Sequence, residues 1–194
     1  MEQIGDMQST QSQCASQVRW PLMFLCAVIF LAASAKPSLA QAEHAVPDNL
    51  KPPSGQLLVL RGHATGVQIY TCQSSASGDS QFAWQLTAPD AKLVDDSGKE
   101  IAKHFTGPTW QSPDGSLVKG KVVSQSAPDR DSIPWLLLTA VEHSGSGVMN
   151  DVVTIQRLNT KGGKAPATGC DAQHQGTKVR VNYAADYYFY APAK

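Results

Sequence analysis

Short segments in which apolar and polar residues alternate place the strongest limit on the fold of this chain. The clearest is 81–86, in which Phe82, Trp84 and Leu86 fall on one face and glutamines on the other. A period of two residues is what a half-buried β-strand requires, because successive side chains point to opposite sides of a sheet. We therefore predict that these three side chains face a core.

The chain from residue 56 onward repeats this pattern. Short apolar or alternating segments occur at 56–60, 67–72, 91–94, 100–105, 117–125, 133–141, 148–158, 178–183 and 186–190. Turn sequences such as Ser112-Pro-Asp-Gly-Ser116 separate them, since proline presets φ and glycine permits the reversal. About nine or ten strands and no convincing amphipathic helix predict an all-β fold, a single-domain antiparallel sandwich or barrel. The segment 133–141 suggests a central strand, although its periodicity also allows a buried helix.

An apolar run at 20–35 precedes these segments and follows a single basic residue, Arg19. Its 16 residues are fewer than the roughly 20 that cross a bilayer comfortably. Ser38 and Ala40 fit the small-x-small cleavage pattern of a secretory signal. We predict that residues 1–40 are a signal peptide removed after Ala40, which makes the mature protein secreted or periplasmic. The alternative is an uncleaved N-terminal anchor.

The prolines at 47, 52 and 53 predict a linker over 41–54, followed by the all-β domain over 55–194. The chain holds 16 Lys and Arg residues against 16 Asp and Glu residues, so its formal net charge is zero. Without a basic stripe or a block of like charge, we expect neither nucleic acid nor, after cleavage, a membrane as a partner.

Two of the four cysteines remain after cleavage, Cys72 and Cys170. An even pair in an oxidising compartment predicts one disulfide, which closes a loop of roughly 100 residues. The alternative is two free, buried thiols.

The mature chain resembles a family of secreted bacterial and fungal proteins known only as a domain of unknown function, DUF family 3455. The matching stretches are Pro53-Ser-Gly-Gln-Leu-Leu58, Gly66-Val-Gln-Ile-Tyr-Thr-Cys72, Gly107-Pro-Thr-Trp110, Asp114-Gly-Ser116, Ile133-Pro-Trp-Leu-Leu-Leu138, Ile155-Gln-Arg-Leu-Asn-Thr160 with Gly162-Gly163, and Ala185-Asp-Tyr-Tyr-Phe-Tyr190. The resemblance implies a secreted single domain and supports the pairing of Cys72 with Cys170. It implies no activity, substrate or catalytic residue.

The histidines give no metal-ligand spacing. His63, His104, His143 and His174 form no His-x-His or His-x-x-x-His pair, and Asp171 and His174 lie in a loop beside the predicted disulfide. We expect scattered, solvated histidines and no metal or other cofactor, although ligands can also assemble across strands.

Catalytic motifs are equally sparse. No Gly-x-Ser-x-Gly elbow occurs, and Asp114 lies in a turn where its side chain can accept from the backbone two residues on. We therefore predict a structural role for Asp114. A glycosidase needs two carboxyls at a set spacing across a cleft, which Asp114, Asp186 or Glu100 could supply.

The tryptophans differ in their surroundings. Trp84 and Trp135 lie in apolar segments and are predicted to be core residues, whereas Trp110 follows Gly-Pro-Thr and is the best placed to be exposed.

On the final segment, Tyr188 and Tyr190 share a face with Asp186, opposite Tyr187 and Phe189. One face is expected to be core, and the other could present an aromatic platform to a sugar or another apolar ligand.

These observations predict a non-catalytic protein that binds a small molecule, a glycan or an envelope component, with His104, Trp110 and Tyr188 as candidate ligand-binding residues. They leave the oligomeric state open. The alternatives are an extracytoplasmic hydrolase with a cross-strand carboxylate pair and a structural or stress-protective envelope protein.

Overall fold

The computed structural model describes residues 45–75 and 81–194. The predicted signal peptide at 1–40 lies outside these residues. The described chain forms strands joined by turns, with two short 3₁₀ turns, in the order η1 (Asp48–Leu50), β1 (Gln56–Ser74), β2 (Phe82–Val94), β3 (Glu100–Phe105), β4 (Thr109–Gln111), β5 (Leu117–Ser126), β6 (Trp135–Ser144), β7 (Thr154–Gly162), η2 (Ala172–His174) and β8 (Lys178–Pro192). Within this part of the chain, no helix has the length and apolar character that spanning a membrane would need.

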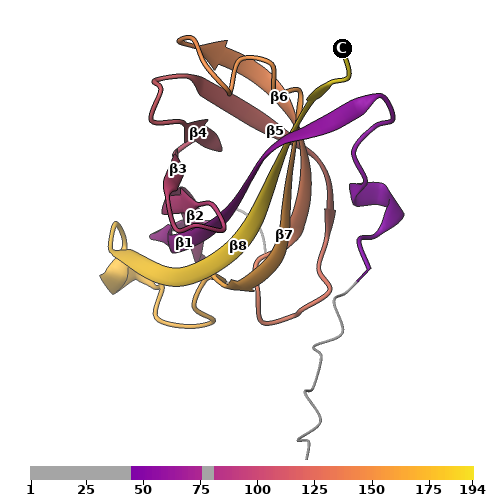
Figure 1. Cartoon of the computed structure of the whole chain (residues 1–194). Helices are drawn as coiled ribbons and strands as arrows, with labels where there is room; N and C mark the ends of the chain where they lie inside the picture. The colour runs from indigo at the N-terminus through magenta and orange to yellow at the C-terminus, as the bar shows by residue number, and fades with distance from the viewer. Residues whose placement is uncertain (1–44, 76–80) are drawn as a thin grey trace, which may run out of the picture. The chain divides into compact units, whose positions relative to one another are not determined.

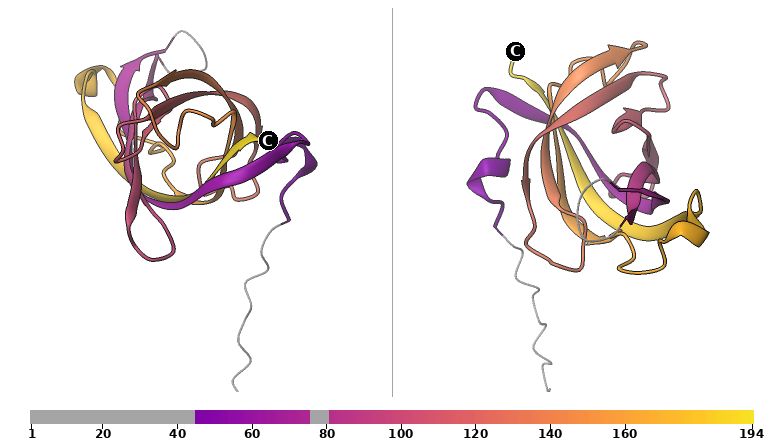
Figure 2. Two further views of the ribbon diagram at one scale, coloured as in Figure 1. Left: turned by 45° about the horizontal axis from the view of Figure 1, so that its top comes forward. Right: turned by 180° about the vertical axis from the view of Figure 1, so that it is seen from behind.

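Each strand pairs antiparallel with the next, and β8 returns to pair with β1, so the sheet closes into a barrel (Figures 1 and 2). This confirms the all-β prediction and decides for a barrel over a sandwich. The described residues hold eight strands, fewer than the nine or ten expected, because three pairs of predicted segments are continuous strands: 56–60 with 67–72 in β1, 81–86 with 91–94 in β2, and 178–183 with 186–190 in β8. One strand that was not expected, β4, is added. The ambiguous segment 133–141 contributes most of a strand, β6, rather than a helix.

Small residues on β1 let the wall of the barrel come close to its neighbours. A Cβ atom placed on Gly66 would lie 2.5 Å from the Cα atom of Ala91, and one on Gly62 would lie 2.6 Å from Cδ1 of Ile101. Ala64 lies between these glycines and faces the same interior. Because these residues occupy little volume, larger side chains from other strands can fill the barrel.

The interior core consists of uncharged side chains packed against one another. Its buried members are Ala64, Ala91, Leu93, Ala102, Trp110, Val118, Ile133, Leu138, Met149, Val152, Ile155, Tyr183, Ala185, Tyr187 and Phe189. The inner face of β8 is therefore the Tyr187 and Phe189 face, and Tyr188 and Tyr190 lie on the outer face.

A second apolar cluster lies on the outside of the barrel under η1. Leu50 is fully buried there against Trp135, Leu137 and Leu158. The amide of Gln156 donates to the carbonyl of Leu50 at 2.5 Å. The described part of the segment predicted as a linker is thus packed onto the barrel at Leu50, and Trp135 is buried as expected, although outside the barrel.

The prediction that Phe82, Trp84 and Leu86 face a core is wrong for Leu86, which is 56% exposed. Only Ala91–Val94 of β2 pairs with β3, so the first half of β2 pairs with β1 alone. A register shift opposite Ile69 and Tyr70 also interrupts the alternation along β2. Trp84 is only partly buried, and its indole N–H donates to the carbonyl of Thr168 at 2.9 Å.

The structure contains the predicted disulfide between Cys72 and Cys170, with Cα atoms 5.3 Å apart and a sequence separation of 98. It ties β1 to the loop that precedes β8. Two backbone hydrogen bonds reinforce this connection, from the N–H of Cys72 to Thr177 and from the N–H of Gly176 to Cys72.

Removing this disulfide by the double substitution Cys72→Ala and Cys170→Ala should lower the free energy of unfolding by about 2–5 kcal/mol, since a loop of roughly 100 residues is released in the unfolded chain. Urea denaturation of oxidised protein and the double variant measures the difference. Two free thiols in the unfolded, non-reduced protein would contradict the prediction.

Candidate binding site inside the barrel

His104 and Trp110, two of the three predicted ligand-binding residues, lie together inside the barrel. They are Cα partners across β3 and β4, and their rings stack with centroids 4.4 Å apart and an interplanar angle of 3°. Their exposed fractions are 3% and 1%. The expectation that Trp110 is exposed is therefore wrong. The short strand β4 turns the indole inward, and Gly120 leaves room for the ring, since a Cβ there would lie 3.2 Å from it.

Tyr187 and Phe189 complete this aromatic group from β8. The Tyr187 ring meets His104 at 5.3 Å and Trp110 at 5.5 Å, in both cases edge to face. Phe189 meets Trp110 at 5.9 Å. The sequence indicated that one face of 186–190 is core and the other a possible ligand platform, and Tyr188 was selected as the binding residue. Tyr187 could have been selected instead, because it lies on the opposite face, which the structure shows to be core.

The histidine in this group is neutral. Burial lowers the pKa of His104 from its usual 6.5 to about 3. Its Nδ1 lies 2.9 Å from the carbonyl oxygen of Thr109, which can only accept, so the ring proton is on Nδ1. The remaining nitrogen, Nε2, is therefore a neutral acceptor.

Several polar atoms beside these rings lack a well-formed hydrogen bond within the protein. The indole Nε1 of Trp110 and both amide atoms of Gln68 have no partner, and the hydroxyls of Tyr183 and Tyr187 lie near each other and near Arg157 without good hydrogen-bond geometry; we call these four residues, Trp110, Gln68, Tyr183 and Tyr187, the inner polar cluster. Each of the four residues is at most 3% exposed. An unpartnered buried polar group costs about 1–3 kcal/mol, and native proteins satisfy nearly all such groups with protein, water or ligand.

Three members of the inner polar cluster, Gln68, Tyr183 and Tyr187, lie on the wall formed by β1 and β8, and Trp110 comes from β4. Tyr183 and Tyr187 lie opposite Gly66 and Gly62 on β1, four positions apart along each strand. A Cβ on Gly163 would lie 2.8 Å from Cβ of Tyr183 and 3.3 Å from Cγ of Gln68, so Gln68 and Tyr183 approach the same glycine. The two tyrosine hydroxyls influence each other's pKa, and burial raises the pKa of both.

A cation, Arg157, lies beside this cluster and was not predicted. It pairs in register with Leu136 and Tyr187, which are packed into the interior core or against it. Its Nε and Nη2 donate to the carbonyl of Pro134 at 3.1 and 2.8 Å. The available signal was alternation within the predicted segment 148–158, because Arg157 lies two positions after Ile155, which the structure places in the core.

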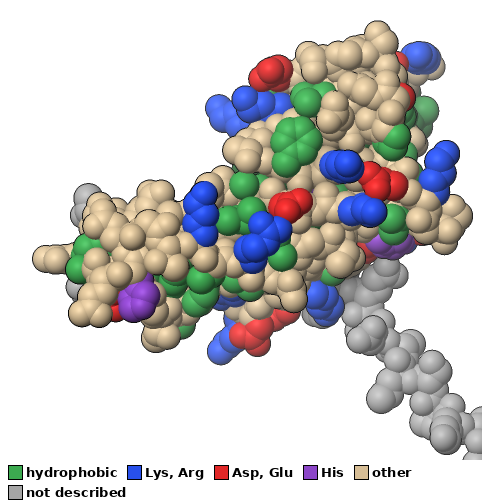
Figure 3. All heavy atoms as spheres, turned by 90° about the vertical axis from the view of Figure 1, so that its left-hand side faces the viewer, with side chains coloured by type: hydrophobic (Ala, Val, Ile, Leu, Met, Phe, Trp, Pro, Cys, Tyr) green, Lys and Arg blue, Asp and Glu red, His purple; other side chains and the backbone are tan. Residues whose placement is uncertain are grey.

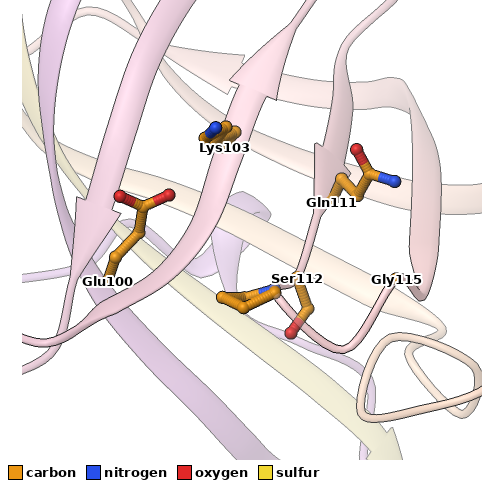
Figure 4. Close-up of a pocket in the computed structure, with 6 residues that line it drawn as sticks. Glu100, Lys103, Gln111, Ser112 and Gly115 are labelled. Atoms are coloured by element: carbon orange, nitrogen blue, oxygen red, sulfur yellow. The ribbon is translucent and has the colours of Figure 1, made fainter.

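Two surface hollows lie on the side of the barrel formed by β2, β3 and β4. One of about 430 Å³ is lined by residues that include the interior side chains Ala91 and His104. Another of about 330 Å³ lies over β3 and β4, where Figure 4 shows Glu100, Lys103 and Gln111 projecting from neighbouring strands without converging. Within residues 45–75 and 81–194, no three His, Cys, Asp or Glu side chains form a group that could hold a metal ion.

Tyr188, the third predicted residue, is not brought to His104 and Trp110. It lies on the outer face of β8, beside the cluster under η1, and the guanidinium of Arg61 is 5.8 Å from its ring centroid.

Close to Tyr188 in the sequence, Asp186 forms part of an outer network around His63. Nδ1 of His63 lies 2.6 Å from Asp186, and Nε2 lies 2.9 Å from Asp96. Asn159, which adopts a positive φ of 51°, donates to the other oxygen of Asp186 at 2.8 Å. Both ring nitrogens can donate together only when the imidazole is protonated. Hydrogen bonds to Asp96 and Asp186 accordingly raise the pKa of His63.

The structural role predicted for Asp114 is confirmed. Its carboxylate accepts from the N–H and hydroxyl of Ser116 at 2.9 and 2.6 Å and from the N–H of Val148 at 2.9 Å. These bonds lower its pKa to about 2. Glu100 pairs with Lys92 at 3.1 Å, so each of the carboxylates considered for catalysis has its own partners.

The family model described as "Protein of unknown function (DUF3455)" matches residues 53–191. The chain belongs to the DUF3455 family. The match covers all eight strands of the barrel almost entirely, so the interior site is a feature of the DUF3455 domain of this chain. A search of curated proteins found no match, and neither did a search of solved structures.

The outer network should make stability depend on pH through His63. Because its pKa is raised in the folded state, its contribution is complete below about pH 6.5, the unfolded value, and is lost as the pH rises through the folded pKa. His63 is 41% exposed, so we expect less than about 1 kcal/mol. Urea midpoints of wild type and His63→Gln between pH 5 and 9 should converge at high pH; a constant difference would contradict this.

Proposed function

We propose that this DUF3455 protein is an exported, non-catalytic binding protein that holds a small molecule inside its barrel. The observation that supports this most strongly is the inner polar cluster, in which donors and acceptors from β1, β4 and β8 are buried without a well-formed hydrogen bond in the protein. Eight-stranded barrels are of the size that either fills its interior with side chains or encloses one small ligand. A protein under selection for stability alone would gain by replacing these groups with apolar ones.

The interior suits binding better than catalysis. His104 has one nitrogen occupied by Thr109 and a pKa of about 3, so it is a weak base at neutral pH. The inner polar cluster offers tyrosine hydroxyls whose pKa values are raised, which disfavours the ionised, nucleophilic form. An enclosed site walled by aromatic rings also fits a small molecule better than a glycan chain.

We expect neither nucleic acid nor an anionic surface as a partner, because the positive charges on the outer surface are mixed with negative ones. On the face that includes β3 and β4, Lys and Arg side chains are interspersed with Asp and Glu side chains and apolar ones (Figure 3). Ion pairs such as Arg180 with Asp90, at 2.6 Å, neutralise local charge.

Ligand binding inside the barrel can be tested with Trp110→Phe, which keeps an aromatic ring but removes the indole N–H. Trp84→Phe is the matched control, because Trp84 uses its N–H on Thr168 in a partly buried position away from the core. A panel of small organic acids, sugars and polyols is screened by thermal shift. We expect at least one compound to stabilise wild type and Trp84→Phe but to stabilise Trp110→Phe far less.

The proposal fails if no compound of the panel stabilises the protein and a high-resolution crystal structure shows ordered waters on every member of the inner polar cluster. That outcome would favour a structural or stress-protective envelope protein.

We further propose that the chain is exported and cleaved after Ala40, to a secreted or periplasmic location. The disulfide supports this, because such bonds persist in oxidising compartments. N-terminal sequencing of protein recovered from the exporting host should give Gln41 as the first residue. An intact leader would contradict the cleavage.

A further inference from the structure

We infer that the ligand inside the barrel is a small organic carboxylate and that Arg157 binds its negative charge. This inference rests on the proposed function and adds the chemical class of the ligand. It is argued from the charge balance of the interior, from the donors that remain free there and from the aromatic walls.

Among the described residues, Arg157 is the cation beside the interior core, and no buried core residue carries a negative charge to neutralise it. All buried members of the interior core are uncharged, and Arg157 pairs in register with Leu136 and Tyr187 at the core. Among the ion pairs of the described residues, none includes Arg157. A charge removed from water and left without a counter-ion is costly, so a binding site for an anion is a physical reason to keep it there.

The nearest acidic influence lies outside the barrel. Asp90 is near enough to affect the pKa of Tyr183, but its carboxylate is bonded to Arg180 at 2.6 Å on the surface. Arg157, in contrast, acts on the interior groups: it adds to the lowering of the pKa of His104 by burial and opposes the rise in the pKa of Tyr187. The buried core residues beside Arg157 are uncharged, and its positive charge acts on two of the interior groups.

The donors near Arg157 match an acceptor-only ligand. A guanidinium has five N–H donors, and two of them, on Nε and Nη2, point to the carbonyl of Pro134. The other donors lie near the hydroxyl of Tyr187 and can also bind a planar carboxylate, which an arginine recognises with two parallel hydrogen bonds. The indole N–H of Trp110 is a further donor without a partner in the protein, and the hydroxyls of Tyr183 and Tyr187 lack a well-formed hydrogen bond.

The apolar walls indicate that the anion is organic. The Trp110 ring meets Tyr187 and Phe189 edge to face at 5.5 and 5.9 Å, and the rings of Tyr187 and Phe189 stack at 6.5 Å, in the core that also holds Ala64 and Ala185. An inorganic anion would leave these surfaces unused, whereas a short aliphatic or aromatic acid contacts them with its apolar part. Since large side chains already occupy much of the barrel, the acid must be small.

The test compares matched probes on the whole mature protein at pH 7 by isothermal titration calorimetry. Butyrate, benzoate and phenylacetate are the carboxylates; benzamide and phenylacetamide are their neutral counterparts, and inorganic phosphate is the inorganic anion. We expect at least one carboxylate to bind at least tenfold more tightly than its amide, and phosphate to bind more weakly than that carboxylate.

Substitutions connect the binding to the site. Arg157→Met should weaken carboxylate binding at least tenfold, and Arg157→Lys should weaken it less, because a charge remains. Arg180→Met is the matched control and should bind as wild type does. Tyr187→Phe, which keeps the ring and removes only the hydroxyl, gives a second readout if Arg157→Met does not fold: it should weaken binding while retaining the native circular dichroism spectrum.

Two results separate this inference from the proposed function. If amides bind as tightly as carboxylates and Trp110→Phe abolishes both, the barrel binds a small molecule but the carboxylate inference is wrong. Phosphate binding without carboxylate binding, or full binding by Arg157→Met, also overturns it. If no probe binds and ordered waters occupy the inner polar cluster, both the inference and the proposed function fail.

Discussion

The pairing of β1 with β8 is the constraint on which the rest of the structure depends. It runs from Gln56 opposite Pro192 to Thr71 opposite Lys178, and it joins the first strand of the domain to the last. Without it, the sheet would have two free edges and an exposed inner face. With it, alternate residues of every strand face one enclosed space, where neither aromatic rings nor polar groups meet bulk water.

Closure explains why the two faces of β8 have different roles. Its inner face supplies the rings and hydroxyls of Tyr183 and Tyr187, and its outer face supplies Asp186 and Tyr188 to contacts on the surface. The disulfide and the backbone hydrogen bonds of Cys72 with Thr177 and Gly176 hold the loop before β8 against β1. The covalent link therefore reinforces the same strand pair that closes the sheet, at the end where β8 starts.

The enclosed space combines apolar packing with polar groups that the protein does not satisfy. Gly120 on β5 leaves room for the Trp110 ring, and Gly62 and Gly66 on β1 admit the close approach of Ile101 and Ala91. The inner polar cluster and Arg157 lie within or beside that packing. Burying their polar groups lowers the stability of the fold, and the apolar packing of the core offsets this loss. Such a local conflict with stability is where a functional site is expected.

The sequence by itself determined the strands, the turn held by Asp114 and the disulfide partners, because alternation, turn chemistry and cysteine pairing depend on local order or on covalent chemistry. It brought His104 and Trp110 into one candidate site, although it placed Trp110 at the surface. Only the tertiary structure decided that the sheet closes as a barrel, that β4 turns Trp110 inward, and that Arg157 and Gln68 face the same interior. The physical reason is that period two gives two faces for each strand but not which face is inside: that is fixed by register between strands distant in sequence, and a register shift, as in β2, reverses it.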